Sequence, residues 1–337
     1  MSHIIVTIGP AINTEDRLTK LYTEGARILR FNFSHYNAQT ASKEIEVIRK
    51  VEKKIGEKFS LLLDTEGPGI RTGFLSQAIS YETGDEFKIF TDEKLITAGE
   101  KNLFCDYPFL IQDVYEGGTI KIDSGLFEVT VMQKGSDYIL VKAKNNFLVG
   151  SRRHINLPGV TLKLPTIGDK DKEDVLFAIK NKFEYIDMSF TRSKQDVKDL
   201  RVFLAENEGE HIKIISKIES QEGVDNVNEI IDASDMIMVA RGDLGTELPI
   251  ETIPGIQMNI VKKCKQKQKK VIVATQMLET MITNRIPTRA EVSDIFYAVL
   301  QGADYVMLSG ETAVGKYPIS CVKIMNKVIV EANKYVE

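Results

Sequence analysis

The segments IISKIE (Ile214–Glu219) and MIMVARGDL (Met236–Leu244) are short apolar runs that both end in charged residues. Runs of this length that are rich in β-branched residues are typical of strands buried on both faces. Lys217 and Glu219 are two residues apart, so on a strand their side chains point in the same direction. Because an unpaired charge is costly to bury, this pattern predicts that the strand tips carry out chemistry.

Six further runs of the same form bring the number of predicted strands to eight. They are Ile4–Ile8, Arg27–Phe33, Phe59–Asp64, Tyr185–Phe190, Val271–Gln276 and Tyr305–Gly310. Polar stretches with helical periodicity separate most of the runs, and eight strand–helix units predict an α/β fold, a (β/α)8 TIM barrel. A doubly wound open sheet is the competing arrangement, and the count of eight favours the barrel.

One long connection interrupts this alternation. The stretch from residue 74 to 163 contains short apolar runs separated by Gly and Asp turns, which predicts a small all-β domain inserted after the third strand. We therefore expect residues 1–73 and 164–337 to form the barrel. Because the insertion follows a strand tip, we expect the inserted domain to act as a lid that excludes water.

The composition excludes several classes of protein. Of 337 residues, 43% are hydrophobic and 27% charged, as in ordinary soluble proteins, and the net charge of −4 gives no footprint for binding nucleic acid. No apolar stretch is long enough for a membrane span, and no signal peptide precedes the first strand, so we expect a cytoplasmic location. Three scattered cysteines and four scattered histidines predict reduced thiols and no zinc site.

Two carboxylates at neighbouring strand tips suit a divalent metal. Glu219 and Asp243, together with substrate oxygens and water, match the shell that Mg²⁺ prefers. The alternative is an ion-pair network with Lys217 and Arg241. A lysine beside a metal is suited to stabilise a developing oxyanion or a transferring phosphoryl group.

Other tips carry further polar groups. Arg30 suits a phosphoryl group, and the stretch from Gly242 to Gly245 offers backbone N–H groups to an anion. Thr275 is a hydroxyl at the end of a strand, where threonine is usually structural. Four small oxygen donors could surround a monovalent cation, namely Asn32, Ser34, Asp64 and Thr65. For Asn32 and Ser34 a satisfied turn is an equal alternative.

Ten segments, in the right order over nearly the whole chain, strongly resemble the pyruvate kinase family. They are TIGPA (Thr7–Ala11), RFNFSH (Arg30–His35), DTEGPGIRTG (Asp64–Gly73), GSRRHINLPG (Gly150–Gly159), KDKEDV (Lys170–Val175), SKIES (Ser216–Ser220), ARGDLG (Ala240–Gly245), ATQMLETM (Ala274–Met281), PTRAEVSD (Pro287–Asp294) and MLSGETAVGKYP (Met307–Pro318). Such co-linearity is far more specific than any single motif.

The resemblance implies phosphoryl transfer from phosphoenolpyruvate to ADP, which gives pyruvate and ATP through enolpyruvate, with Mg²⁺ or Mn²⁺ and K⁺ as cofactors. By motif position, it implies that Lys217 stabilises the phosphoryl group and the enolate, and that Thr275 lies near the carbon that is protonated. It also implies that Arg30 and the Gly242–Asp243 loop bind substrate, that Glu219 and Asp243 bind Mg²⁺, that Asn32, Ser34, Asp64 and Thr65 bind K⁺, and that His35, Arg71 and Arg153 contact nucleotide.

The chain departs from the family pattern in four places. It ends soon after MLSGETAVGKYP, where the family usually continues into a C-terminal domain, so we expect a short form without that domain's effector site. The sequence leaves open whether copies of the chain form a homo-oligomer through the barrel. The family's DTKGPEIRTG is here DTEGPGIRTG, with Glu66 and Gly69 replacing two charged positions. The lid has Asp123-Ser124 where two aspartates are usual, and His154 stands where a glycine is usual. These changes leave K⁺ dependence and the phosphoryl acceptor open.

Two alternatives follow from these departures. The first is a divergent enzyme that uses enolate chemistry on another 2-oxo acid or another phosphoryl acceptor. The second is a non-catalytic remnant, which fits poorly because Lys217, Glu219, Asp243 and Thr275 are all present.

Overall fold

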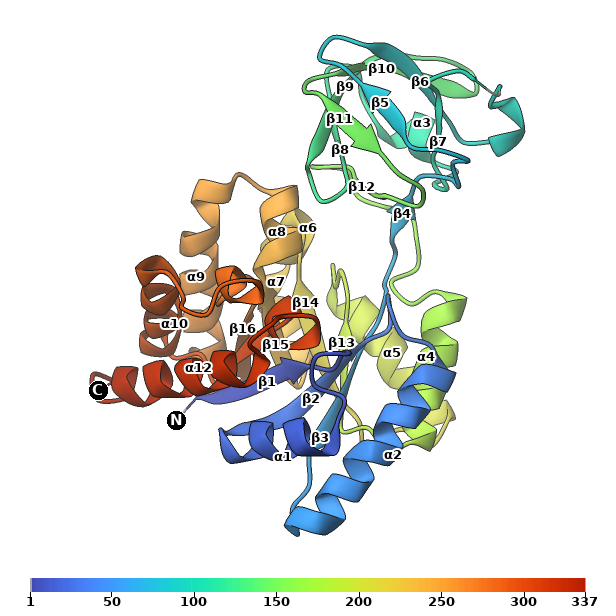
Figure 1. The fold of residues 1–337 in the computed structure, drawn as a ribbon. Coiled ribbons are helices and arrows are strands. Elements are labelled where there is room, and N and C mark those ends of the chain that lie inside the picture. The colour runs from blue at the N-terminus through green and yellow to red at the C-terminus, as the bar shows by residue number, and fades with distance from the viewer. Residues whose placement is uncertain (1, 98, 337) are drawn as a thin grey trace. The chain divides into compact units, whose positions relative to one another are not determined.

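The computed structural model describes residues 2–97 and 99–336. Eight parallel strands close into a barrel, which confirms the predicted (β/α)8 fold (Figure 1). Around the barrel the order is β1 (His3–Thr7), β17 (Tyr305–Leu308), β16 (Lys270–Ala274), β15 (Met236–Ala240), β14 (Lys213–Ile218), β13 (Tyr185–Met188), β3 (Ser60–Asp64) and β2 (Ala26–Asn32), and β2 pairs again with β1.

Helices connect consecutive strands and cover the outside of the barrel (Figure 1). The longer ones are α1 (Glu15–Thr23), α2 (Ala38–Ile55), α4 (Asp169–Lys180), α5 (Lys194–Glu206), α7 (Val227–Ala233), α9 (Ile253–Gln266), α10 (Arg289–Gln301) and α12 (Pro318–Ala332). Short ones follow strand tips: α6 (Gln221–Asp225), α8 (Arg241–Glu247), α11 (Gly310–Ala313) and the 3₁₀ turns η2 (Ile250–Thr252) and η3 (Glu279–Ile282). Capping boxes at Ser193 and Thr288 begin α5 and α10. None of the helices in the described ranges is long and apolar enough to cross a bilayer.

The barrel interior is apolar below its charged end. One buried cluster joins inward-facing residues from the strands, among them Ile28, Leu62 and Ile215. Since side chains alternate along a strand, the next inward positions are Arg30, Asp64 and Lys217. The charged groups therefore lie directly above an apolar layer that keeps water out of the lower barrel.

Contacts divide the chain into two compact units. The barrel unit comprises Met1–Gly67, Thr166–Leu244 and Glu251–Glu337, and the inserted unit comprises Pro68–Pro165 and Gly245–Ile250. The inserted unit contains a seven-stranded sheet in the order β4 (Ile70–Arg71), β12 (His154–Asn156), β8 (Thr119–Ile122), β9 (Phe127–Lys134), β10 (Tyr138–Ala143), β6 (Glu86–Phe90) and β7 (Leu103–Phe104). A two-stranded sheet pairs β11 (Phe147–Val149) with β5 (Ile79–Tyr81), and two short helical turns complete it, η1 (Glu93–Leu95) and α3 (Leu110–Asp113).

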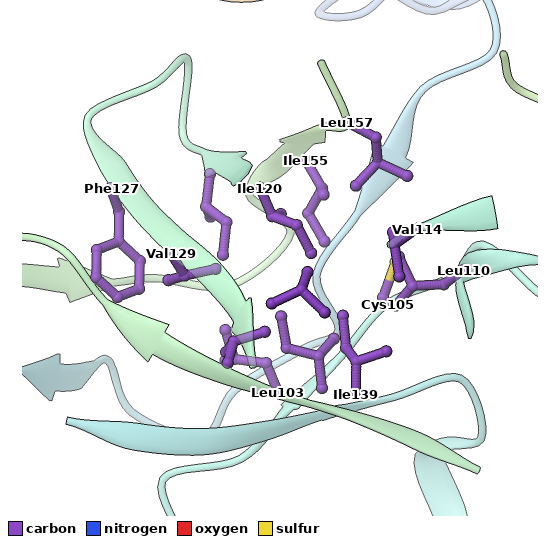
Figure 2. Packing of buried hydrophobic residues seen from close by; sticks show 14 of the residues in the cluster. Leu103, Cys105, Leu110, Val114, Ile120, Phe127, Val129, Ile139, Ile155 and Leu157 are labelled. Atoms are coloured by element: carbon purple, nitrogen blue, oxygen red, sulfur yellow. The ribbon is translucent and has the colours of Figure 1, made fainter. Parts of the chain in front are cut away.

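The inserted unit has a hydrophobic core of its own (Figure 2). Its centre includes Leu103, Ile120, Val129, Ile139 and Ile155, all at most 2% exposed. These residues come from five different strands of the sheet. The unit therefore has a hydrophobic core of its own, which is one of the usual criteria for a domain.

The barrel is closed by a tight contact between the tip of β1 and the turn after β17. Thr7 N donates to Thr312 Oγ1 (3.0 Å), and Ala11 N donates to the carbonyl oxygen of Ala313 (3.0 Å). A Cβ atom added at Gly9 would lie 2.4 Å from that same carbonyl oxygen. Only glycine allows the two backbones to approach this closely.

We predict that Gly9→Ala lowers the melting temperature by several degrees, because displacing packed backbone costs about 1–3 kcal/mol. Gly255→Ala is the matched control. Nothing lies within 4 Å of a Cβ there, and alanine is the better helix former. Equal melting temperatures for Gly9→Ala and the parent would show that the closing turn tolerates displacement.

Candidate active site

The Lys217 ammonium group is the centre of the polar cluster inside the barrel mouth. Its Nζ donates to Asp64 Oδ1 (3.0 Å) and to Ser189 Oγ (2.9 Å), and it lies 3.0 Å from Glu219 Oε1. Burial alone would lower the pKa of Lys217, but the facing carboxylates Asp64 and Glu219 raise it above its usual value. Lys217 therefore stays charged although only 8% of the residue is exposed.

Arg30 is a second buried cation in the cluster. Its Nε donates to Asp64 Oδ2 (3.0 Å), its Nη2 forms a second bond to the same oxygen, and its Nη1 donates to Thr7 Oγ1 (2.8 Å). Burial would raise the pKa of Asp64, but Arg30 and Lys217 hold it below its usual value. Asp64 is thus a charged acceptor that fixes both cations in the barrel mouth.

Glu219 is fully buried at the tip of β14. Its Oε2 accepts a hydrogen bond from Phe190 N (2.7 Å), whereas its Oε1 has no hydrogen-bond partner by geometry within the described residues and lies 3.0 Å from the Lys217 ammonium. Burial raises the pKa of Glu219; Lys217 opposes this rise, and nearby Asp243 adds to it. Two carboxylates that repel each other in this way form a place that favours a bound cation.

The described residues contain no group of three or more His, Cys, Asp or Glu side chains arranged to hold a metal ion. Mg²⁺, however, commonly takes one or two carboxylates and completes its shell with water and substrate oxygens. The unbonded Glu219 Oε1, whose carboxyl group also feels the charge of Asp243, fits such an ion. In the structure the Lys217 ammonium supplies the positive charge next to that oxygen.

Thr275 follows β16 in a strained conformation. Its φ of 72° lies in the left-handed region, which β-branched residues rarely adopt. Its Oγ1 accepts a hydrogen bond from Gly242 N (2.8 Å) and donates to the Ala274 carbonyl (2.6 Å). The Thr275 hydroxyl and the Gly242 amide are therefore held together at adjacent strand tips.

Arg241 stabilises the turn at Thr275. Its Nη2 donates to the Thr275 carbonyl (2.6 Å), and its Nη1 donates to Asp294 Oδ1 (2.7 Å). The ion-pair network weighed from the sequence therefore holds for Lys217 with Glu219, while the ion pair described for Arg241 is with Asp294.

The four oxygen donors predicted for a monovalent cation lie at or just beyond the ends of two neighbouring strands, β2 and β3. Asn32 and Asp64 are register partners of β2 and β3, and Thr65 follows directly. Asn32 Oδ1 accepts from Ser34 N (3.1 Å), which is the satisfied turn considered for these two residues. Thr65 Oγ1 donates to the Asp187 carbonyl (3.1 Å), so protein groups engage most of these oxygens.

The residues predicted to contact nucleotide fall in both units. His35 belongs to the barrel unit, where its backbone N donates to the Asn32 carbonyl (3.0 Å). Arg71 and Arg153 belong to the inserted unit. There Arg153 Nη1 lies 3.5 Å from Asp123 Oδ1, and Arg71 Nη1 donates to the Arg152 carbonyl (3.4 Å).

Three residues at which the chain departs from the family pattern, Glu66, Gly69 and His154, have identified neighbours. Glu66 Oε2 lies 3.7 Å from Lys170 Nζ, so its negative charge has a counter-ion in the barrel unit. A Cβ atom at Gly69 would lie 3.3 Å from His154 Nε2, which means that the His154 ring fills the space beside the glycine. The changes at positions 69 and 154 are therefore structurally coupled.

Sequence reasoning gave no role to two residues of the cluster, Ser189 and Asp187. Ser189 Oγ accepts from Lys217, as described above, and donates to the Thr65 carbonyl (2.7 Å). Asp187 is 0% exposed, and neither of its side-chain oxygens has a hydrogen-bond partner among the described residues. The available signal was a single aspartate within the apolar run of β13.

A buried lysine held among carboxylates at the strand tips of a closed barrel defines the general class. It is that of TIM-barrel proteins with a charged site at the carboxyl ends of the strands. The family model for the pyruvate kinase barrel domain matches residues 1–322. Pyruvate kinase from Lactobacillus delbrueckii subsp. bulgaricus is 42% identical over 335 residues, which are 98% of this chain and 56% of the relative. The enzyme from Clostridium acetobutylicum is 43% identical over 330 residues, 98% of this chain and 70% of the relative.

The fold gives the same result. The crystal structure of a pyruvate kinase from Cryptosporidium parvum superimposes with a TM-score of 0.96 at 41% identity and covers 100% of this chain and 70% of that one. The chain therefore belongs to the pyruvate kinase family. It spans little more than half the length of several of the relatives that it matches.

We predict that Lys217→Met lowers the melting temperature by about 5 °C or more, since removing one partner of a buried ion pair costs about 3–5 kcal/mol. Adding Glu219→Gln should recover part of that loss, because the orphaned carboxylate is then neutral. Thermal unfolding of the two single variants and the double variant measures this coupling. Strictly additive shifts would mean that Lys217 and Glu219 do not stabilise each other.

Proposed function

We propose that this chain transfers the phosphoryl group of phosphoenolpyruvate to ADP and forms pyruvate and ATP through enolpyruvate. The observation that carries the proposal is the buried, charged Lys217 ammonium held between Asp64 and Glu219, in a chain of this family. Phosphoryl transfer depends on positioning and charge neutralisation more than on covalent catalysis, and a cation in a dry barrel mouth provides both.

In this proposal the barrel residues have the following roles. Lys217 neutralises charge on the phosphoryl group in transfer and on the enolate oxygen. Arg30, fixed by Asp64, adds a second positive charge for the phosphoryl group. Thr275 and the Gly242 amide, joined by a 2.8 Å hydrogen bond, bind the enolpyruvate end, where the Thr275 hydroxyl helps to deliver a proton to the methylene carbon.

Glu219 and Asp243 would hold Mg²⁺ or Mn²⁺, which supplies Lewis-acid stabilisation of phosphoryl and enolate oxygens when bound. Asn32, Ser34, Asp64 and Thr65 would hold K⁺, and their present hydrogen bonds would have to be exchanged for bonds to the ion. In both places the chain's own cations, Lys217 and Arg30, bind the carboxylates in the structure.

The ion pair between Glu66 and Lys170 supports ADP as the acceptor. An isolated Glu66 carboxylate would repel a polyphosphate, but Lys170, which also pairs with Asp174 (2.7 Å), lies 3.7 Å from Glu66 and offsets part of that charge. His35 in the barrel unit, with Arg71 and Arg153 in the inserted unit, would contact the nucleotide. We propose the inserted unit, residues 74–163 in the sequence-based division, as the lid of a cytoplasmic enzyme with small-molecule substrates and no nucleic-acid or membrane partner.

The proposal is tested by coupling pyruvate formation to lactate dehydrogenase, with phosphoenolpyruvate, Mg²⁺ and each nucleoside diphosphate, with and without K⁺. We predict turnover with ADP that Lys217→Met reduces by at least about 100-fold, the usual effect of removing a group that stabilises transition-state charge. Turnover no higher than that of Lys217→Met with every diphosphate would contradict the proposal. Solvent deuterium entering the methyl group of pyruvate, without ADP-dependent turnover, would instead indicate a divergent enolate enzyme.

A second prediction isolates the hydroxyl of Thr275. Thr275→Val keeps the β-branched shape and should lower kcat by about 10- to 100-fold, because it removes the hydroxyl that we place in proton delivery. Thr275→Ser keeps the hydroxyl and is the matched control, with kcat close to that of the parent. Equal kcat values for the valine and serine variants would exclude the hydroxyl from the reaction.

A further inference from the structure

Asp187 is a buried acid that the proposed mechanism leaves unused. It lies on β13 as the register partner of Asp64 on β3 and of Ile215 on β14. Tyr185, two residues before it, packs against the cluster inside the barrel, so alternation directs the Asp187 side chain into the barrel as well. The segment around it belongs to none of the motifs that carry the family resemblance.

The surroundings of Asp187 make it an unusual component of a stable core. It is 0% exposed, and both carboxylate oxygens lack a hydrogen-bond partner in the described structure. The charged groups that act on it are Asp64 and Glu219, which repel a negative charge there, and Lys217 and Arg30, which attract one. Burial, followed by Asp64, raises the pKa of Asp187 well above its usual value. Such a group destabilises a fold, so its presence calls for an explanation such as a functional role.

Lys217 provides such a role. Its ammonium has three hydrogens, and the structure gives it three partners: Asp64, Ser189 and Glu219. Two of these partners are carboxylates that we propose as cation ligands. A metal ion that binds them therefore competes with the Lys217 ammonium, which then keeps Ser189 but lacks a charged acceptor.

We propose that Asp187 is the positioning residue that receives the Lys217 ammonium on the interior side of the barrel when cations occupy Glu219 and Asp64. Of the four carboxyl groups that act electrostatically on Lys217 or on one another here, Asp187 alone has no assigned ligand role and no hydrogen bond in the described residues. The inference rests on the proposed function, because it needs a cation site at Glu219.

The test is Mn²⁺ binding to the whole protein in the presence of K⁺, measured by calorimetry without substrates, so its readout is independent of turnover. Asp187→Asn keeps the shape of the side chain and removes the acid. We expect it to weaken Mn²⁺ binding by about tenfold, within the range of coupling energies measured between contacting residues. Its metal-free melting temperature should equal or exceed that of the parent, since an unpaired buried acid has been removed.

Repeating Asp187→Asn in the Lys217→Met variant tests whether Asp187 acts through Lys217 or attracts the metal ion directly. In Lys217→Met no ammonium has to be relocated, so Asp187→Asn should leave Mn²⁺ affinity unchanged there. Glu44→Gln removes a buried acid of helix α2 that accepts a hydrogen bond from Tyr36, and it should leave Mn²⁺ affinity unchanged in the parent.

Two results would overturn the inference. One is an unchanged Mn²⁺ affinity in Asp187→Asn, and the other is an equal loss in the parent and in the Lys217→Met background. Failure of the proposed function is a different result, because it appears as absence of phosphoryl transfer by the parent while Mn²⁺ binding can still be compared between variants.

Discussion

The shared ion pair of Lys217 with Asp64 and Glu219 is the interaction on which the rest of the barrel mouth depends. It joins β14 to β3 across 153 residues of sequence, and Arg30 from β2 binds the same Asp64. Charges buried this deeply are tolerated only when each has a partner in good geometry. The positions of three strand tips are therefore fixed by electrostatic interactions. The packing of the strands below them is fixed by the apolar layer that includes Ile28, Leu62 and Ile215.

This arrangement also couples the proposed cation sites to the two basic side chains, Lys217 and Arg30. The carboxylates that would bind metal are the same groups that hold Lys217 and Arg30. A bound cation and a basic side chain thus compete for the same oxygens. Ligand binding at this site must rearrange the positive charges of the chain, and the free energy of that exchange contributes to the apparent metal affinity.

Much of this fold could be predicted from the sequence, because its signals are local. Eight β-branched runs predicted the eight strands, and a spacing of two residues predicted that Lys217 and Glu219 point the same way; the structure shows them 3.0 Å apart. Partners distant in sequence could not be predicted. Arg241 with Asp294 is an example, since nothing in either local segment distinguishes this pair from other charged residues. A second example is the segment Gly245–Ile250, which belongs to the inserted unit although it is distant in sequence. This membership depends on tertiary contacts alone.

The unpaired polar groups of the barrel are concentrated at or near the carboxyl ends of its strands. In the described part of the chain, the buried side-chain oxygens without a hydrogen bond belong to Asp187, Glu219 and Ser309. Each lies two residues beyond an inward-facing residue of its strand or strand tip, and Thr275 with its positive φ follows a neighbouring strand. Strain and unpaired polar groups persist only where the surrounding structure compels them and where removing them would sacrifice function. Glu219 and Thr275 have roles in the proposed reaction. By the same reasoning the buried acid at Asp187, which is equally unfavourable for the fold, belongs to the working site and not to the scaffold below it.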